Sequence, residues 1–531
     1  MDAKSTIEAG KAILGIEFGS TRIKAVLIDE DNRPIAQGCH EWENQLVDGL
    51  WSYSVEAVWF GLQDCYRDLR ANVKELYGVE IERLASIGVS AMMHGYMAFD
   101  KNGKILTPFR TWRNTNTGRA AAELSELFVF NIPLRWSISH LYQAILDNEE
   151  HVKEIDFLTT LAGYIHWQIT GERVLGIGDA SGMLPIDPST KDYSMEMVDK
   201  FDRLISDKGY KWTLTDILPK VLVAGESGGF LTPAGAKSID ISGHLQPGIP
   251  VCPPEGDAGT GMTATNAVKK CTGNVSAGTS SFSMIVLEKD LSKPYEVIDI
   301  VTTPDGSPVA MVHCNNCTSD LNAWVNIFRE YSELMGYKVD MNEIYGRLYN
   351  NALTGDADCG GLMSYNYFSG EPVTGLTEGR PLLVRSVDDK FSLANFMRAN
   401  LYASVSVLKI GNDILFNDEK IKVDRITGHG GLFKTPGVGQ RVLAAALNSP
   451  ISVMETAGEG GAWGMALLAS YLVNNKEGSD LSEFLDKKVF AGDIGFEIIP
   501  TAEDVEGFNR YIKNYVDCLP IEQAAVEYKK Q

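Results

Sequence analysis

One short pattern occurs twice in this chain of 531 residues, and it restricts the possible folds more than any other feature. In each copy an apolar run predicts a strand, then a glycine and small hydroxyl residues form a turn, and a second apolar run predicts a partner strand. The turn glycines, Gly19 and Gly278, lie nearly half the chain apart. Such a hairpin exposes backbone N–H groups at its tip. Two copies, one opening each half, predict two related lobes that face each other.

The segments between the hairpins predict a mixed α/β protein. Helical spacing of apolar residues predicts a helix over 55–76, and short apolar runs predict strands over 87–90 and 96–100. A composition of 44% hydrophobic and 22% charged residues is typical of a globular protein with a core large enough for an enzyme. A Gly/Pro-rich stretch over 246–257 predicts a domain boundary with an active site beside it.

Charge and composition exclude several partners. The net charge of −22 argues against nucleic acid, which draws most of its binding free energy from Lys and Arg. The longest apolar stretch, 462–473, is too short to cross a bilayer, so we expect no membrane association. The N-terminus lacks the apolar run of a secretory signal, and the eight cysteines are scattered, which predicts a cytoplasmic protein with reduced thiols. We interpret the Cys314–Cys317 pair as two buried or strand-end residues.

Common nucleotide and hydrolase motifs are absent from the sequence. It contains no GxxxxGK[ST] and no GxGxxG, which excludes a P-loop ATPase and argues against a Rossmann dinucleotide site. It also contains no HExxH zinc motif and no GxSxG elbow. Any phosphate site must therefore use another kind of loop.

The two turns are candidates for that role. Small residues let the backbone approach a ligand, and the N–H and hydroxyl groups of Ser20 and Thr21 could hold phosphate oxygens. The carboxylate of Glu17 could hold Mg²⁺ directly or through water. An ordinary hairpin with a solvated Glu is the alternative. Thr279 and Ser280 have the same two interpretations, and together the turns favour a phosphate clamp.

Asp257 lies between Gly256 and Ala258, next to the predicted boundary. A carboxylate with so little bulk beside it can meet a substrate hydroxyl, and phosphoryl transfer to an alcohol needs such a proton acceptor. The alternative is an Asp that caps a helix over 260–268, and composition alone favours the cap.

Two further groups are suited to small ligands. Polar and aromatic residues such as His94 and Trp112 suit a sugar, although a lone His is more often structural and an Arg is usually solvated. Glycines at 428–431 and 458–464 could let an adenine lie against bare backbone, or could be tight helix starts.

With these motifs in place, the chain resembles the FGGY family of carbohydrate kinases from about residue 12 to 473. The ordered matches are GIEFGSTRIKAVLID (15–29), MHG (93–95), ITGE (169–172), DASG (179–182), LTPAGA (231–236), EGDAG (255–259), SAGTSS (276–281), YNYFSGEP (365–372), GHGGLFKTP (428–436) and GAWGMALLA (461–469). The resemblance implies an α/β, actin-like ATPase (ribonuclease H-like) fold, duplicated in two lobes with an interlobe cleft for ATP and sugar. Residues 1–262 would form the lobe with the first phosphate hairpin, the sugar site and the catalytic Asp, and residues 263–531 the lobe with the second phosphate turn and the adenosine site.

The resemblance also implies roles for individual residues. Asp257 matches the catalytic base, and Glu17 and Asp257 would hold Mg²⁺. The substrate-binding set would be Met93, His94, Trp112, Arg113, Asn114 and Asp257. The ATP-binding set would be Gly19, Ser20, Thr21, Arg22, Gly278, Thr279, Ser280, Gly430, Gly431 and Lys434.

The expected activity is ATP-dependent phosphorylation of a small sugar hydroxyl, with a ketopentose such as D-xylulose as the leading substrate and a homodimer as a possible assembly. Two departures bear on this expectation: the family usually has Asp at the position of Glu17, and the TWRNTNTG stretch at 111–118 differs from the family pattern. L-Ribulose, L-xylulose and glycerol are alternative substrates, and a non-catalytic, nucleotide-gated sugar sensor is the alternative function.

Overall fold

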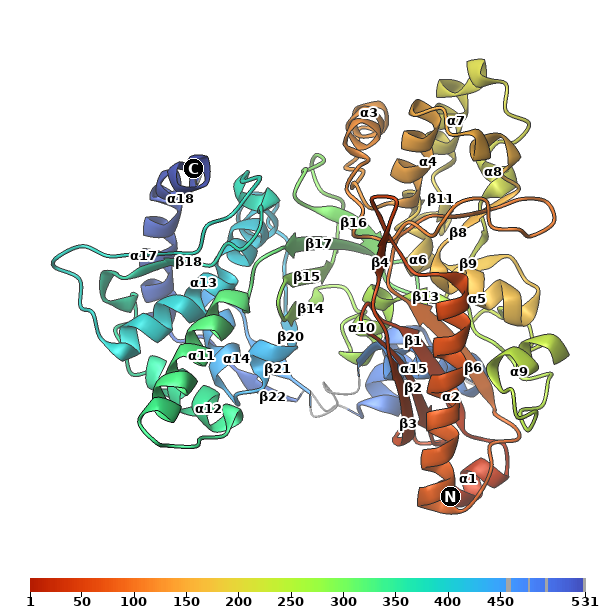
Figure 1. Cartoon of the computed structure of the whole chain (residues 1–531), viewed down its shortest axis with the longest axis horizontal. Coiled ribbons are helices and arrows are strands. Elements are labelled where there is room, and N and C mark those ends of the chain that lie inside the picture. The colour runs from red at the N-terminus through yellow and green to blue at the C-terminus, as the bar shows by residue number, and fades with distance from the viewer. Residues whose placement is uncertain (455–459, 476–477, 492–494, 529–531) are drawn as a thin grey trace. The chain divides into compact units, whose positions relative to one another are not determined.

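The computed structural model describes residues 1–454, 460–475, 478–491 and 495–528 (Figure 1). Its contacts divide the chain into two compact units. Unit 1 comprises Met1–Val268, Asp299–Val309 and Glu459–Asp493, and unit 2 comprises Lys269–Ile298, Ala310–Gly458 and Ile494–Gln531. Unit 1 therefore takes two segments from the second half of the chain. The division at 262 and 263 stays a prediction.

The centre of unit 1 is a mixed five-stranded sheet. Strand β1 (Ile13–Phe18) pairs antiparallel with β2 (Arg22–Ile28) and parallel with β6 (Ser86–Ala91), which confirms the first predicted hairpin. The full order is β13-β6-β1-β2-β3, where β3 is Pro34–Glu41 and β13 is Glu255–Gly256.

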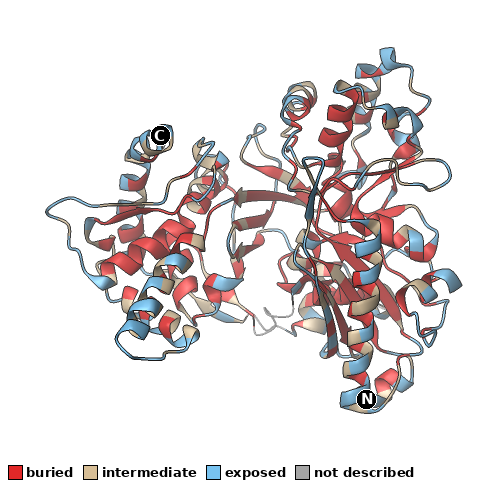
Figure 2. Cartoon of the chain, viewed as in Figure 1, coloured by how far each residue is buried: buried red, intermediate tan, exposed pale blue. Residues whose placement is uncertain are grey.

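Two helices cover this sheet, and Figure 2 shows much of the sheet in the colour of buried residues. Helix α2 (Val55–Tyr77) packs on β3, and α15 (Gly460–Asn474) packs on β1 and β6. Helix α15 can lie so close to β1 because position 15 is a glycine. A Cβ at Gly15 would lie 2.1 Å from the Ala462 carbonyl oxygen.

Smaller elements complete unit 1. They are the helices α1 (Ala3–Glu8), α3 (Gly118–Phe128), α4 (Ser137–Leu146), α5 (Leu161–Thr170), α6 (Ile177–Ala180), α7 (Met195–Leu204), α8 (Leu214–Ile217), α9 (Pro233–Ile239), α10 (Asp257–Ala264) and α16 (Leu481–Phe484), and the strands β4 (Gln45–Val47), β5 (Leu50–Ser52), β7 (Met97–Phe99), β8 (Phe157–Thr159), β9 (Val174–Gly176), β10 (Ile186–Asp187), β11 (Asp192–Tyr193), β12 (Lys220–Leu222) and β16 (Asp299–Thr302).

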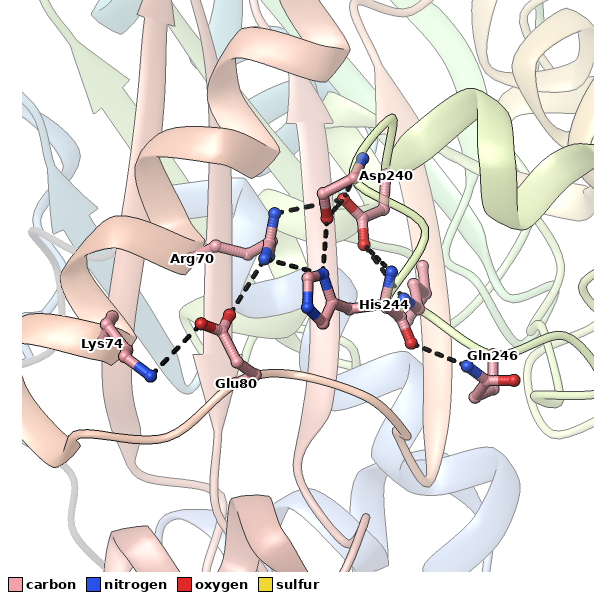
Figure 3. A network of polar contacts seen from close by, with 8 residues as sticks. Arg70, Lys74, Glu80, Asp240, His244 and Gln246 are labelled. Atoms are coloured by element: carbon pink, nitrogen blue, oxygen red, sulfur yellow. Dashed lines mark hydrogen bonds and ion pairs between the residues drawn. The ribbon is translucent and has the colours of Figure 1, made fainter.

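A polar network joins α2 to the loop after α9 (Figure 3). The Arg70 guanidinium contacts Glu80 at 2.9 Å, Asp240 at 3.3 Å and His244 Nδ1 at 3.1 Å. Asp240 in turn accepts the N–H groups of His244 and Leu245 at 2.9 and 3.0 Å. The buried Asp240 carboxylate is therefore paired with a cation and with backbone donors, which is what burial of a charge requires.

Unit 2 repeats the central arrangement of unit 1. Strand β14 (Thr272–Ala277) pairs antiparallel with β15 (Ser281–Val286), as predicted for the second hairpin, and parallel with β20 (Arg425–His429). Strand β20 is parallel to β21 (Ile451–Val453), just as β6 is parallel to β13. The duplicated α/β architecture expected from the two hairpins is therefore confirmed.

The C-terminal segment belongs to the core of unit 2. Strand β22 (Phe496–Ile498) extends the sheet beyond β21, and α17 (Ala502–Asp517) packs on α14 (Val438–Leu447). The remaining elements are α11 (Ser319–Leu334), α12 (Met341–Ala352), α13 (Leu393–Asp413) and α18 (Leu519–Glu527), with β18 (Met363–Tyr365), β19 (Leu382–Val384) and β17 (Pro308–Cys314), whose first two residues belong to unit 1.

The structure bears on the predictions about the cysteines and about membrane-spanning helices. All eight cysteines fall within the described ranges and are free thiols, and Cys314 and Cys317 are both buried, with Cys314 at the end of β17. Throughout the described residues, no helix combines the length and apolar character that crossing a membrane would require.

Candidate active site

The first turn lies between β1 and β2 in unit 1. The Gly19 N–H closes the turn on the Arg22 carbonyl at 2.9 Å. Within the described residues, the N–H groups of Ser20 and Thr21 have no hydrogen-bond acceptor. The Arg22 guanidinium lies 3.5 Å from Glu41 on the surface. Adjacent N–H groups without acceptors form the kind of concave donor set that binds anions.

Glu17 is the next-to-last residue of β1, directly before this turn. The Thr260 hydroxyl donates to its Oε2 at 3.4 Å. Burial raises the Glu17 pKa to about 8, and the negative charge of Asp257 adds to the shift. Asp257 is therefore close enough for its charge to act on Glu17.

Asp257 is the first residue of α10, and the capping alternative is wrong. The N-cap position is Gly256, and no side-chain cap bond forms. Instead, the Asp257 carboxylate accepts the Met93 N–H at 2.9 Å, while the side chain remains exposed to solvent. Desolvation by the surrounding protein raises its pKa. An exposed carboxylate with one oxygen fixed by the backbone is suited to accept a proton from a ligand.

Two buried acids, Glu255 and Asp179, lie in the neighbourhood of Asp257, and the sequence alone assigned them no role. Glu255 accepts the N–H groups of Gly178, Asp179 and Gly256 at 3.1, 3.0 and 3.2 Å. Asp179 accepts the Thr160 hydroxyl at 2.6 Å. Burial raises the pKa of Glu255 to about 8 and that of Asp179 to about 7. The only signal for them in the sequence was their place in the DASG and EGDAG matches.

Of the predicted Met93–His94 pair, Met93 contacts Asp257 and His94 contacts Gly182. His94 is buried with a positive φ of 71°, and its Nδ1 lies 3.3 Å from the Gly182 carbonyl oxygen. A Cβ at Gly182 would lie 2.5 Å from that nitrogen, so the glycine makes room for the imidazole. A buried His with a positive φ, next in the chain to the residue whose N–H holds Asp257, is consistent with a binding role.

The other three predicted sugar residues make contacts within unit 1. The Trp112 indole donates to Ser20 Oγ at 3.3 Å, and Arg113 donates to Asn44 at 3.0 Å. The buried Asn114 amide accepts the Trp51 N–H at 2.8 Å and donates to the Trp51 carbonyl at 2.9 Å. These contacts hold the first turn and the β4–β5 hairpin, and sugar contact by these three residues stays a prediction.

Unit 2 carries the second turn and the predicted adenosine residues together. The Gly278 N–H donates to the Ser280 carbonyl at 2.9 Å, and no acceptor for the N–H groups of Thr279 and Ser280 is found in the described part of the chain. A Cβ at Gly430, whose φ is 101°, would lie 2.6 Å from the Ala277 carbonyl oxygen. The loop with Gly430 therefore touches the end of β14. Gly431 follows in this loop, and Lys434 is exposed three residues later.

The glycines near 460 belong to unit 1. A Cβ at Gly461 would lie 1.6 Å from Glu17 Oε2, and one at Gly464 would lie 2.0 Å from the Thr260 carbonyl oxygen. These two glycines therefore serve close packing of α15, as the helix-start interpretation expected. Gly458 lies outside the described residues.

The residues fit a magnesium ion held mainly by a nucleotide. Among the described residues, no three His, Cys, Asp or Glu side chains are grouped so that they could hold a metal ion by themselves. Mg²⁺ usually keeps several waters and binds one or two carboxylates plus substrate phosphates. Glu17, a carboxylate directly before the first turn, meets that requirement.

Family models match both halves of the chain. Residues 12–263 match the N-terminal domain of the FGGY family of carbohydrate kinases, and residues 273–473 match its C-terminal domain. The chain therefore belongs to the FGGY family of carbohydrate kinases, with its two-domain, actin-like ATPase fold.

Named relatives are similar at low identity. Xylulose kinase from Haemophilus influenzae is 21% identical over 521 residues, which cover 95% of this chain and 99% of the relative. Xylulose kinase from Escherichia coli is 23% identical over 295 residues, but the match spans only 54% of this chain and 56% of that relative. The crystal structure of a "xyloylose kinase" from Brucella ovis shares the fold, with a TM-score of 0.76 at 19% identity, over 96% of this chain and 99% of that one.

Proposed function

We propose that this carbohydrate kinase transfers the γ-phosphoryl group of ATP to a hydroxyl of a small open-chain sugar, and that a ketopentose such as D-xylulose is its substrate. The observation that carries the proposal is the Asp257 carboxylate, which is exposed and is fixed by the N–H of Met93, the chain neighbour of His94. The names of the relatives support a ketopentose.

In the proposed reaction, Asp257 accepts the proton of the sugar's primary hydroxyl as that oxygen attacks the γ-phosphorus in line. The bond between the γ-phosphorus and the bridging oxygen breaks, and ADP leaves with the bond's electron pair. Met93 and His94 orient the sugar. The N–H groups of each turn bind phosphate oxygens and stabilise the negative charge that they carry.

Glu17, with the nearby Asp257, would hold the magnesium ion of Mg-ATP, which neutralises phosphate charge when bound. The family usually has Asp at this position, and the longer Glu side chain suits a contact through water. The Thr260 hydroxyl, 3.4 Å from Glu17 Oε2, orients the carboxylate for that contact.

The test is a coupled assay of ADP release against D-xylulose, L-ribulose, L-xylulose and glycerol, with mass spectrometry of the products. We expect ADP and pentose phosphate in equal amounts, with the highest kcat/KM for D-xylulose. A higher kcat/KM for another compound in the panel would change the substrate but not the reaction class. ATP binding that depends on sugar, with no sugar phosphate formed, would contradict the proposal and indicate the nucleotide-gated sensor.

A further inference from the structure

We infer that Trp42, Tyr53 and Trp112 are positioning residues that prepare the first turn to bind phosphate. We call these three side chains the aromatic collar. The inference rests on the proposed function, because it assigns the collar to the phosphates of ATP. It concerns residues that neither the sequence motifs nor the family resemblance assigned to the turn.

The collar and its backbone engage the carbonyl groups of the turn. The Trp42 indole N–H donates to the Gly19 carbonyl at 2.8 Å, and the Tyr53 hydroxyl donates to the Ser20 carbonyl at 2.6 Å. The Trp42 backbone N–H donates to the Thr21 carbonyl at 3.1 Å. All three carbonyls of the turn therefore point to donors of the protein.

This arrangement decides which groups a ligand meets. A peptide unit that directs its carbonyl to one side directs its N–H to the other side. With the carbonyls held by Trp42 and Tyr53, the N–H groups of Ser20 and Thr21 remain without acceptors among the residues that the structure describes. A phosphate then finds donors already oriented, and it does not have to reorganise the turn on binding.

Trp112 completes the arrangement at the Ser20 side chain. Its indole N–H donates to Ser20 Oγ at 3.3 Å, so the hydroxyl acts as an acceptor in that contact. A hydroxyl has one proton, and this contact leaves that proton available to donate to a ligand. Ser20 therefore offers both an N–H and an O–H to the same phosphate.

The collar is packed firmly enough to act as a support. The Trp42 and Tyr53 rings stack with centroids 4.2 Å apart, and both side chains are buried. Phe18, the last residue of β1, meets the Trp42 ring edge-on at 6.0 Å. Rotation of the Trp42 or the Tyr53 ring would break this packing, so their N–H and O–H donors keep their positions without ligand.

The second turn reaches the same result by different means. The Gly278 carbonyl accepts both the N–H and the hydroxyl of Thr318, at 3.0 and 2.7 Å, and the Thr279 carbonyl accepts the Cys317 N–H at 3.0 Å. In the second turn, two of these three donors are therefore backbone N–H groups. In the first turn, side chains donate to two of the three carbonyls. Substitution of those side chains can therefore test whether they prepare the turn to bind phosphate.

The experiment compares Trp42→Phe, Tyr53→Phe and Trp112→Phe with two matched controls. Trp59→Phe also removes one indole hydrogen bond, to Tyr164 at 3.0 Å, and Tyr77→Phe removes a phenol bond to the Ile35 carbonyl at 2.7 Å. Neither control residue touches the turn. Dissociation constants for Mg-ATP are measured by isothermal titration calorimetry, alongside kcat, KM and the thermal unfolding midpoint.

We expect each collar variant to raise the Kd and KM for ATP by about three- to tenfold, the value of one net hydrogen bond, and both controls to stay within about twofold of wild type. The double variant Trp42→Phe/Tyr53→Phe should bind ATP more weakly than either single variant. ATP binding by Tyr53→Phe equal to that by Tyr77→Phe would overturn the inference, and Tyr53→Phe decides the matter if Trp42→Phe does not fold. Because this measurement reads nucleotide binding, it stays decisive if the wild-type protein binds ATP but phosphorylates no sugar, a result that contradicts only the proposed function.

Discussion

The Glu17 carboxylate can lie against the backbone of helix α15 because residue 461 is a glycine. A Cβ built on Gly461 would lie 1.6 Å from Glu17 Oε2, closer than any non-bonded contact allows. Helix α15 thus approaches the end of β1 at one of the two carboxylates that the family resemblance assigns to magnesium. The position of a proposed metal ligand is therefore set by a residue more than four hundred positions later in the chain.

Gly461→Ala should displace the Glu17 carboxylate and impair catalysis. The added methyl must push either the side chain or α15 away, so we expect kcat to fall at least tenfold and the magnesium concentration needed for half-maximal rate to rise. Steady-state kinetics over a magnesium titration would check this. The matched control is Gly346→Ala in α12, where a Cβ meets nothing within 4 Å. It should keep full activity and gain about 0.5–1 kcal/mol of stability from helix propensity. An unchanged magnesium dependence of the rate in Gly461→Ala would contradict the assignment of Glu17 as a magnesium ligand.

Asp257→Asn should abolish sugar phosphorylation while ATP binding stays largely intact. The amide retains the shape of the carboxylate but cannot accept the hydroxyl proton, a function that contributes about 10²- to 10⁴-fold to rate. Product formation and calorimetric ATP binding would be measured in the same preparation. Asp199→Asn, an exposed position on α7, serves as the control and should behave as wild type. Full activity in Asp257→Asn would refute the assignment of the base.

His140 should make unit 1 less stable in mild acid. Both ring nitrogens are buried without a hydrogen-bond partner in the described residues, and burial, together with the charge of Arg110, lowers the His140 pKa to about 3. Below pH 6.5 the unfolded chain takes up a proton that the folded protein does not, so stability falls as the pH falls. This contribution is roughly 2 kcal/mol at pH 5.

His140→Phe should remove that contribution, because the phenyl ring cannot be protonated. Unfolding midpoints of the variant and wild type, compared at pH 7.5 and pH 5.0, would measure the effect. We expect a smaller decrease in the variant, with a remaining part from His166, whose pKa burial lowers to about 4. Equal decreases in the two proteins would show that His140 does not carry the effect.

Asp504→Asn should destabilise unit 2 by about 3–5 kcal/mol, since it leaves charged arginines without their partner. The buried Asp504 carboxylate contacts Arg398 and Arg441, each at 2.7 Å, and joins α17 to α13 and α14. Urea denaturation followed by circular dichroism would report the change. On the same helix, Asp517 pairs with Lys513 at the surface, so Asp517→Asn should cost no more than about 0.5 kcal/mol. Similar midpoints for the two variants would exclude a structural role for the buried pair.

Much of the fold could be predicted from local patterns. The two hairpins follow from apolar runs around a turn of glycine and hydroxyl residues, and the structure forms them as Ile13–Phe18 with Arg22–Ile28 and as Thr272–Ala277 with Ser281–Val286. The helix expected over 55–76 ends one residue later, at Tyr77, and Gly78 follows in a left-handed conformation. These predictions succeeded because strand alternation, helix spacing and turn chemistry act over neighbouring residues.

The site required the tertiary structure. For Asp257, composition favoured a helix cap, and only the Met93 N–H, which is 164 residues away along the chain, shows how the carboxylate is held. Trp42 and Tyr53 follow no spacing rule that marks them as partners of Gly19 and Ser20. The sequence by itself therefore determined the strands, the turns and the order of the family motifs, because those depend on adjacent residues. Which side chain each turn atom meets was decided by folding, because hydrogen-bond partners distant in sequence are brought together only by packing.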